Sequence, residues 1–224
     1  MIKPRGRRNL PTILISFGRH LVYAEGTKTE PLYVEDLKMF VSEELNVAKE
    51  DIEIIPVKSS KSQHTVDLVE YAIKDVEERK RKQEFITNVW VFYDKDDYKD
   101  FDKAYRLIKA QDRKDADIEW KACWSNECFE VWVYHYFENL ETPIEREQYI
   151  KKINAFLKRN NCPEKYKKNM KGLHHFLTKN GGDIRKATQL MKSKDIDSDI
   201  KPNPSSGIYQ FAEFILTYID HKKN

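Results

Sequence analysis

The sequence predicts an α/β fold in which helices flank a parallel sheet and a mostly helical part completes the chain. Up to residue 124, four short β-prone segments alternate with stretches of helical periodicity. Such alternation is typical of βαβ units, whose parallel sheet is covered on both faces. From Asn126 onward the apolar spacing is helical. We expect a basic arm or strand at 1–19, an α/β domain at 20–140, and a helical region at 141–224 that packs on the sheet.

The expected strands are short apolar runs that end at polar or turn residues, namely 20–24, 51–57, 88–94 and 118–124. The expected helices are segments with one apolar face, namely 29–45, 65–82, 100–111, 126–137, 145–160, 183–193 and 208–219. Thr29 suits the N-cap of the first helix, and Pro31 suits its first turn. Residues 201–207, KPNPSSG, are expected to form a loop.

The composition is that of a folded chain with a well-solvated surface. The 224 residues are 40% hydrophobic and 34% charged, and the net charge is +3. This mildly basic balance permits nucleic-acid binding without demanding it. No apolar run is long enough to span a membrane, and the stretch from Leu10 to Phe17 has no signal-peptide cleavage site after it. With three cysteines and no CxxC pair, we expect reduced thiols and a cytoplasmic location.

Acidic residues follow two of the expected strands. Glu25 comes directly after the first strand, and Asp94 ends the third strand in the sequence VFYDKDD. Ligand sites of open parallel sheets lie beyond the carboxyl ends of the strands, so both acids should reach one rim. If the chain stays extended past Asp94, Asp96 points to the same side, with Asp97 nearby.

Converging carboxylates repel one another unless a proton or a cation relieves them. Hard oxygen donors suit Mg²⁺ or Mn²⁺, and such a metal polarises a phosphoryl oxygen and activates water. The competing interpretation is a solvated turn in which an aspartate caps the next helix. On DKDD alone that interpretation is favoured. The Glu-Gly pair after the first strand, in AEGTKTEP, shifts the balance toward a two-part site.

A strand followed by Glu-Gly and a later strand followed by Asp-x-Asp are similar to the TOPRIM fold of topoisomerases, primases and OLD-type nucleases. More closely, AEGTKTEPLYVEDL, VFYDKDD, SNECFEVWVYHYF and NPSSGIY together resemble the RloB family, with gaps, from about residue 20 to 215. The segment before Glu25, SFGRHLVYA, is less uniformly apolar than that pattern, which leaves open whether residues 12–17 form an extra or a substitute first strand.

The resemblance implies a TOPRIM-like sheet and a part in bacterial anti-phage defence, such as abortive infection, beside a partner ATPase called RloA. It implies that Glu25 matches the TOPRIM glutamate, a general acid/base and metal contact. It also implies that Asp94 and Asp96 match the Asp-x-Asp that holds the metal.

Three further residues are candidates around this rim. Lys28 lies in the polar loop before the first helix, where it could bind phosphate; an ordinary capped turn is equally compatible. Asn126 and Glu130 are four apart and would share one helical face, with Ser125 as the cap of that helix. Glu130 is favoured as a further metal ligand or orienting group, whereas Asn126 suits either a substrate phosphate or a buried polar contact. His135 is interpreted as a hydrogen-bonded core residue.

Basic runs lie at 5–8, 78–82, 158–161 and 164–171, and Tyr166 in the last run could stack on a base. Such runs are equally typical of solvated helix faces. Beside an acidic pocket, however, basic flanks favour a metal-dependent enzyme that acts on nucleic acid.

The leading hypothesis is a Mg²⁺-dependent (or Mn²⁺-dependent) TOPRIM-like endonuclease that hydrolyses RNA or DNA with an RloA-like ATPase as partner. Glu25, Asp94 and Asp96 would be catalytic, and these three together with Glu130 would hold the metal. Lys28 and Asn126 would bind substrate. The alternative is a non-catalytic regulatory or sensor subunit that binds metal or nucleotide for a partner toxin, and a third hypothesis is an interaction module with solvated acids.

The sequence leaves several properties of such a protein open. They are the identity of the substrate (DNA, tRNA or other RNA), the number of metals, the trigger that activates the protein, and the oligomeric state. A homodimer is compatible with the sequence. No membrane partner is expected.

Overall fold

The computed structural model describes residues 17–45, 51–57, 65–95, 100–195 and 201–223. A five-stranded sheet runs in the order β2-β1-β3-β4-β5. Its strands are β1 (His20–Ala24), β2 (Ile52–Pro56), β3 (Asn88–Asp94), β4 (Glu119–Asn126) and β5 (Ser205–Ser206). The first four strands are parallel, whereas β5 pairs antiparallel with β4. The predicted α/β class with a mostly parallel sheet is confirmed.

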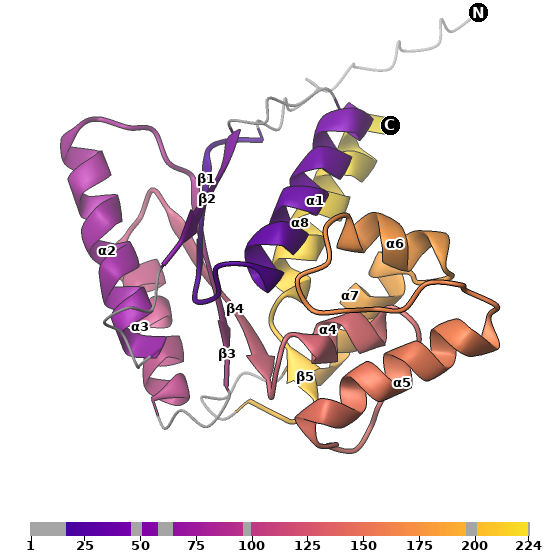
Figure 1. Ribbon diagram of the computed structural model, residues 1–224. Coiled ribbons are helices and arrows are strands. Elements are labelled where there is room, and N and C mark those ends of the chain that lie inside the picture. The colour runs from indigo at the N-terminus through magenta and orange to yellow at the C-terminus, as the bar shows by residue number, and fades with distance from the viewer. Residues whose placement is uncertain (1–16, 46–50, 58–64, 96–99, 196–200, 224) are drawn as a thin grey trace, which may run out of the picture.

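Helices cover both faces of this sheet (Figure 1). One face carries α2 (Thr65–Arg81) and α3 (Phe101–Lys114), and the other carries α1 (Thr29–Leu45) and α8 (Tyr209–Lys223), which lie side by side. The remaining helices gather beside α1 and α8, namely α4 (Glu130–His135), α5 (Arg146–Arg159), α6 (Leu173–Lys179) and α7 (Ile184–Lys194). A sheet covered on both faces explains why β1 and β3 are continuous apolar runs rather than alternating ones.

The prediction of a helix from residue 126 was wrong, and so was the prediction that Ser125 caps it. β4 extends through Asn126, and Ser125 lies within this strand. Ser125 and Asn126 pair with Ser206 and Ser205 of β5, so their backbone groups serve the sheet instead of a helix. α4 begins only at Glu130, and Asn126 therefore does not share a helical face with it. Neither β5 nor α6 was expected from the sequence.

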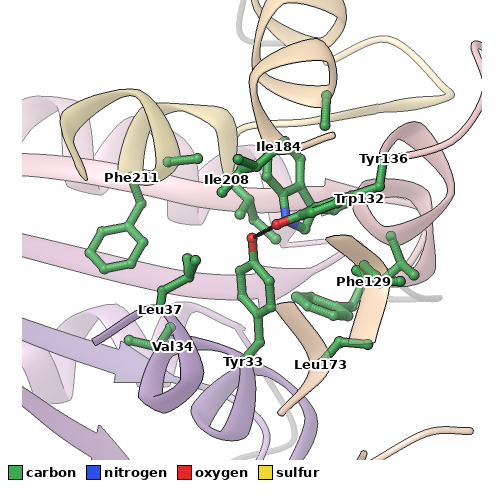
Figure 2. Close-up of a cluster of buried hydrophobic side chains, with 14 of the residues drawn as sticks. Tyr33, Val34, Leu37, Phe129, Trp132, Tyr136, Leu173, Ile184, Ile208 and Phe211 are labelled. Carbon is green, nitrogen blue, oxygen red and sulfur yellow. Dashed lines mark hydrogen bonds between the residues drawn. The ribbon is translucent and has the colours of Figure 1, made fainter. Parts of the chain in front are cut away.

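The larger of the two cores lies between the sheet and the helices on the side of α1 and α8. In its centre, aromatic side chains from α1 and α4 meet through polar atoms (Figure 2). The indole Nε1 of Trp132 donates to the Tyr33 hydroxyl over 2.7 Å, and the Tyr33 and Tyr136 hydroxyls lie 2.6 Å apart. Because these buried polar atoms hydrogen-bond to one another, the cost of burying them is offset where α4 packs against α1.

α8 packs directly on β3. The ring of Phe211 lies 5.0 Å from the ring of Trp90 and 5.6 Å from that of Phe92, both in edge-on geometry. Gly207, just before this helix, permits the close approach, because a Cβ there would come within 2.6 Å of the Ala122 carbonyl oxygen. The C-terminal helices thus share one core with the sheet.

Two further expectations concern the ends of the predicted regions. Most of the predicted arm, residues 1–16, lies outside the described residues. The predicted boundary between residues 140 and 141 stays a prediction.

Candidate active site at the carboxyl edge of the sheet

Glu25 and Asp94 come to the same edge of the sheet. β1 and β3 are parallel neighbours in which Ala24 lies opposite Phe92. The N–H of Glu25 donates to the Phe92 carbonyl over 3.0 Å, so the pairing continues one residue beyond β1. Glu25 is therefore opposite Tyr93, one position before Asp94.

The pleat of β3 sends Tyr93 and Asp94 to opposite faces of the sheet. The ring of Tyr93 belongs to the core under α2 and α3, where burial and, to a lesser degree, nearby charges that include Glu25 raise the pKa of its hydroxyl. The carboxylate of Asp94 lies on the other side, toward α4. The two acids thus share a rim, and the Asp94 carboxylate faces α4.

Asp94 connects the end of β3 to α4 and α5. Its Oδ2 accepts the backbone N–H of Phe129 over 3.2 Å and lies 3.6 Å from Nη2 of Arg146. The Asp94 side chain is 14% exposed, and these two partners offset the cost of burying its carboxylate.

The backbone remains paired just beyond Asp94, since the N–H of Lys95 donates to the Ser125 carbonyl over 2.9 Å. Asp96 and Asp97 follow outside the described residues. The expected direction of the Asp96 side chain therefore stays a prediction.

Glu130, the first residue of α4, is 2% exposed and is held by two side chains from the segment after α5. The hydroxyl of Tyr166 donates to its Oε1 over 3.2 Å, and Nζ of Lys168 lies 3.5 Å from the same oxygen. Burial, followed by the charge of Glu130, raises the pKa of Tyr166 well above its usual value, so this hydroxyl stays protonated and donates. The prediction that Tyr166 could stack on a base was wrong, because its ring is 1% exposed.

The Cys128 thiol is influenced by the charges of both Asp94 and Glu130. Burial is the main cause that raises the pKa of its thiol, and the charges of Glu130 and Asp94 follow, whereas Arg146 lowers it. The thiol therefore remains protonated and hydrogen-bonds to Glu130. Cys128 thus lies near both carboxylates at the start of α4, with Arg146 nearby.

Glu30 brings a further acid to this neighbourhood from the first turn of α1. A Cβ on Gly26 would collide with the Glu30 carboxylate, which lies across the Glu-Gly turn. The charge of Glu30 is also a minor cause of the raised pKa of Tyr166. The Glu30 carboxylate thus lies against Gly26, and a side chain at position 26 would require this flexible carboxylate to move.

Lys28 is exposed in the turn that leads into α1. Its carbonyl accepts the N–H of Leu32 over 2.9 Å and so begins the helix. In the next residue, Oγ1 of Thr29 donates to Oδ1 of Asn169 over 2.9 Å. This contact joins the turn to the lysine-rich segment after α5, although phosphate binding by Lys28 stays a prediction.

The side-chain amide nitrogen of Asn126 makes structural hydrogen bonds. Its Nδ2 donates to the carbonyl oxygens of Lys201 (2.8 Å) and Pro202 (3.1 Å), and the residue is 1% exposed. Its Oδ1 is buried without a hydrogen-bond partner among the described residues. The side chain thus ties the end of β4 to the segment that leads into β5, and its binding of substrate stays a prediction.

The residues at this rim have the donor chemistry of a magnesium or manganese site, because Glu25, Asp94 and Glu130 supply carboxylate oxygens. Within the described parts of the chain, however, no three acidic, histidine or cysteine side chains are grouped closely enough to hold one ion. Asp96, the other predicted ligand, lies outside those parts. The complete ligand set therefore stays a prediction.

His135 is a core residue, as the sequence suggested. Its Nδ1 lies 2.7 Å from the Val131 carbonyl, and its Nε2 accepts the Leu140 N–H over 3.4 Å. Burial lowers the pKa of its ring to about 4, which keeps it neutral.

The sequence did not single out four residues that the fold brings to the acids, namely Glu30, Cys128, Arg146 and Lys168. The first two lie inside the motifs AEGTKTEP and SNECFEVW, but nothing in their spacing distinguishes them. The two cations lie 50 or more residues from Asp94 in the chain, so only the tertiary structure reveals them.

Among known protein families, the one described as RloB, RloB-like protein, matches residues 20–215. The match includes both acid-bearing strand ends and the start of α4. The chain belongs to the RloB family. No curated protein and no solved structure matches it.

Two motifs of this RloB-family chain form the elements beside the rim. SNECFEVWVYHYF ends β4 and forms α4, and NPSSGIY contains β5 and the start of α8. In the second motif, Oγ of Ser206 donates to the Trp124 carbonyl over 3.0 Å and accepts the Ile208 N–H over 3.3 Å. Within the parts of the chain that the structure describes, no helix has both the length and the apolar character for a bilayer crossing.

Proposed function

We propose that this RloB-family chain is a metal-dependent endonuclease that hydrolyses phosphodiester bonds of RNA or DNA in anti-phage defence. The observation that carries the proposal is the hydrogen bond from the Glu25 N–H to the Phe92 carbonyl, 3.0 Å long, at the strand ends where Asp94 also lies. In an open parallel sheet this edge is where ligands bind.

Each rim residue has a role in the proposed reaction. Glu25 accepts a proton from the attacking water or returns one to the leaving oxygen. Asp94 and Asp96 hold the metal, with Glu130 as a further ligand, and Lys28 and Asn126 orient the substrate. A bound Mg²⁺ or Mn²⁺ would neutralise the scissile phosphate and lower the pKa of the attacking water.

Two cations partly balance the negative charge of these acids. Arg146 lies 3.6 Å from Asp94, and Lys168 lies 3.5 Å from Glu130. In the proposed enzyme these cations offset the negative charge of the two carboxylates before substrate arrives. Both are partly exposed, with side-chain exposures of 35% and 46%, and so can also reach a phosphate oxygen.

The test is cleavage of tRNA, other RNA and duplex DNA, with Mg²⁺ and with EDTA, in the presence and absence of an RloA-like ATPase and ATP. Glu25→Gln and Asp94→Asn should each lower the rate at least about 100-fold, which is typical of lost acid–base or metal contacts. Glu164→Gln is the matched control, an exposed acid without an ion pair among the described residues, and should cleave at the parental rate. Undiminished cleavage by both rim variants would refute the mechanism.

The alternative is a regulatory or sensor subunit that binds metal or nucleotide for a partner toxin. The observation that favours it is that Asp94 and Glu130 each have a cation nearby. Such paired charges are compatible with a stable binding site that performs no turnover. Calorimetric binding of Mn²⁺ or nucleotide, combined with no cleavage even when the ATPase and a trigger are present, would support this alternative over the nuclease.

A further inference from the structure

The segment between α5 and α6 carries a dense group of exposed cations. Lys165, Lys167, Lys168 and Lys171 are exposed, against a single exposed acid, Glu164. Of the four lysines, Lys168 makes an ion pair with the buried Glu130. The other three make none within the described parts of the chain, so their charge faces solvent uncompensated.

The basic run at the end of α2 differs in this respect. Arg79 makes ion pairs with Glu53, Asp75 and Glu84, at 2.6, 2.9 and 3.1 Å. Lys80 pairs with Asp115 over 3.1 Å. Much of the charge of this run is therefore neutralised within the protein.

The lysine-rich segment has a fixed backbone. The N–H of Tyr166 donates to Oδ1 of Asn154 on α5 over 2.8 Å, and Nδ2 of Asn154 donates back to the Tyr166 carbonyl over 3.2 Å. Further along, Asn169 accepts the hydroxyl of Thr29, where the segment runs past the first turn of α1 (Figure 1). With the buried Tyr166 ring between these two contacts, the lysines project from a preorganised surface.

This surface is continuous with the candidate active site. Lys168 contacts Glu130, Arg146 contacts Asp94, and the bond between Thr29 and Asn169 brings exposed Lys28 next to the segment. We call the set of six cations the basic ledge: Lys28, Arg146, Lys165, Lys167, Lys168 and Lys171.

We propose that the basic ledge binds the phosphate backbone of a nucleic-acid duplex and leads one strand to the acidic rim, an inference that rests on the proposed nuclease function. Lysine binds phosphate as a point charge, and such contacts position a helix without reading its bases. The ledge thus specifies a class of substrate, a base-paired helix of RNA or DNA, rather than a sequence.

The absence of a stacking surface on the ledge argues for a duplex instead of a single strand. Proteins that bind single strands combine basic grooves with exposed aromatic rings on which bases stack. The large exposed hydrophobic side chains in the described parts of the chain are Tyr71 and Phe85, on α2 and in the connection to β3. Tyr71 is thus on the opposite face of the sheet from α1 and α5, because α2 covers that face (Figure 1), and Phe85 is not part of the segment between α5 and α6.

The test compares two triple variants with equal changes in net charge. Lys165→Glu/Lys167→Glu/Lys171→Glu reverses the ledge. Lys103→Glu/Arg113→Glu/Lys114→Glu reverses exposed cations of α3 on the other face. Binding is measured by fluorescence anisotropy in EDTA, over a range of salt concentrations, with an RNA duplex, a DNA duplex and an unpaired oligonucleotide. Equal thermal unfolding of both variants and the parent verifies their folds.

We expect the ledge variant to bind both duplexes at least tenfold more weakly and the α3 variant to bind like the parent. The slope of log K against log salt should fall by about one for each lysine that contacts phosphate. Duplexes should bind more tightly than the unpaired oligonucleotide, and a difference between the RNA and DNA duplexes would identify the natural helix. Equal losses in the two variants, parental binding by the ledge variant, or preference for the unpaired strand would each overturn the inference.

These binding results are independent of cleavage, because EDTA removes divalent metal. If the parent binds duplexes through the ledge but never cleaves them with Mg²⁺, the nuclease proposal fails and the ledge stands. If the parent cleaves and the ledge variant cleaves and binds equally well, the ledge fails and the nuclease stands.

Discussion

Removal of the Tyr166 hydroxyl should destabilise the protein measurably while leaving the site acids in place. The buried carboxylate of Glu130 is held by the Tyr166 hydroxyl and by Lys168. In Tyr166→Phe it loses the hydrogen bond of 3.2 Å to the hydroxyl and keeps the ion pair with the partly exposed Lys168. Hydrogen bonds to charged groups contribute about 1.5–3 kcal/mol, and the ring itself is unchanged, so we expect a loss in that range. For a chain of this length it corresponds to a fall in Tm of about 3–12 °C.

Tyr134→Phe is the matched control. The hydroxyl of Tyr134 also donates to a glutamate, Oε2 of Glu138, over 2.8 Å, but the Glu138 side chain is 37% exposed. Water replaces that hydrogen bond easily, so the loss should stay below about 1 kcal/mol. Both variants are measured by urea denaturation at pH 7. A loss for Tyr134→Phe that equals or exceeds the loss for Tyr166→Phe would refute the argument that burial of Glu130 sets the magnitude.

Three other changes test the remaining structure. Gly207→Ala should cost about 1–3 kcal/mol in urea denaturation, because its Cβ would overlap the Ala122 carbonyl, and an unchanged midpoint would contradict the observed packing of β5 on β4. Tyr33→Phe leaves the buried indole N–H of Trp132 without its acceptor and should cost about 1–3 kcal/mol; a neutral effect would mean that water or another acceptor takes its place. Burial lowers the pKa of His20, His135 and His174 to about 4, whereas in the unfolded chain these rings take up a proton near pH 6.5. The free energy of unfolding should therefore fall as the pH drops from 6.5 toward 4. Equal urea midpoints at pH 7 and 5 would contradict this.

Much of the architecture follows from local patterns. The four parallel strands lie where short apolar runs predicted them, because a doubly covered sheet requires side chains that are apolar on both faces. α1 and α2 also match the predicted ranges closely, since each has an apolar face at helical spacing. The end of β4 does not follow from local pattern, because its last residues pair with β5, about 80 residues later in the chain.

The same division applies to the candidate site. Strand ends in a parallel sheet meet at one edge, so Glu25 and Asp94 could be assigned to a common rim before any coordinates were known. What surrounds each acid could not be assigned in this way. Glu130 is buried against Tyr166 and Lys168, which come from an irregular segment whose course no periodicity encodes.

By itself, the sequence determined the class of fold, the positions of the four parallel strands along the chain and the RloB resemblance, because these depend on residue spacing that local physics translates directly into strands and helices. The tertiary structure alone decided which cations face the acids, how Asn126 is used and where the lysines of the basic ledge lie. Those properties depend on contacts between segments up to 140 residues apart, such as Thr29 with Asn169, and such contacts form only when the whole chain buries its core.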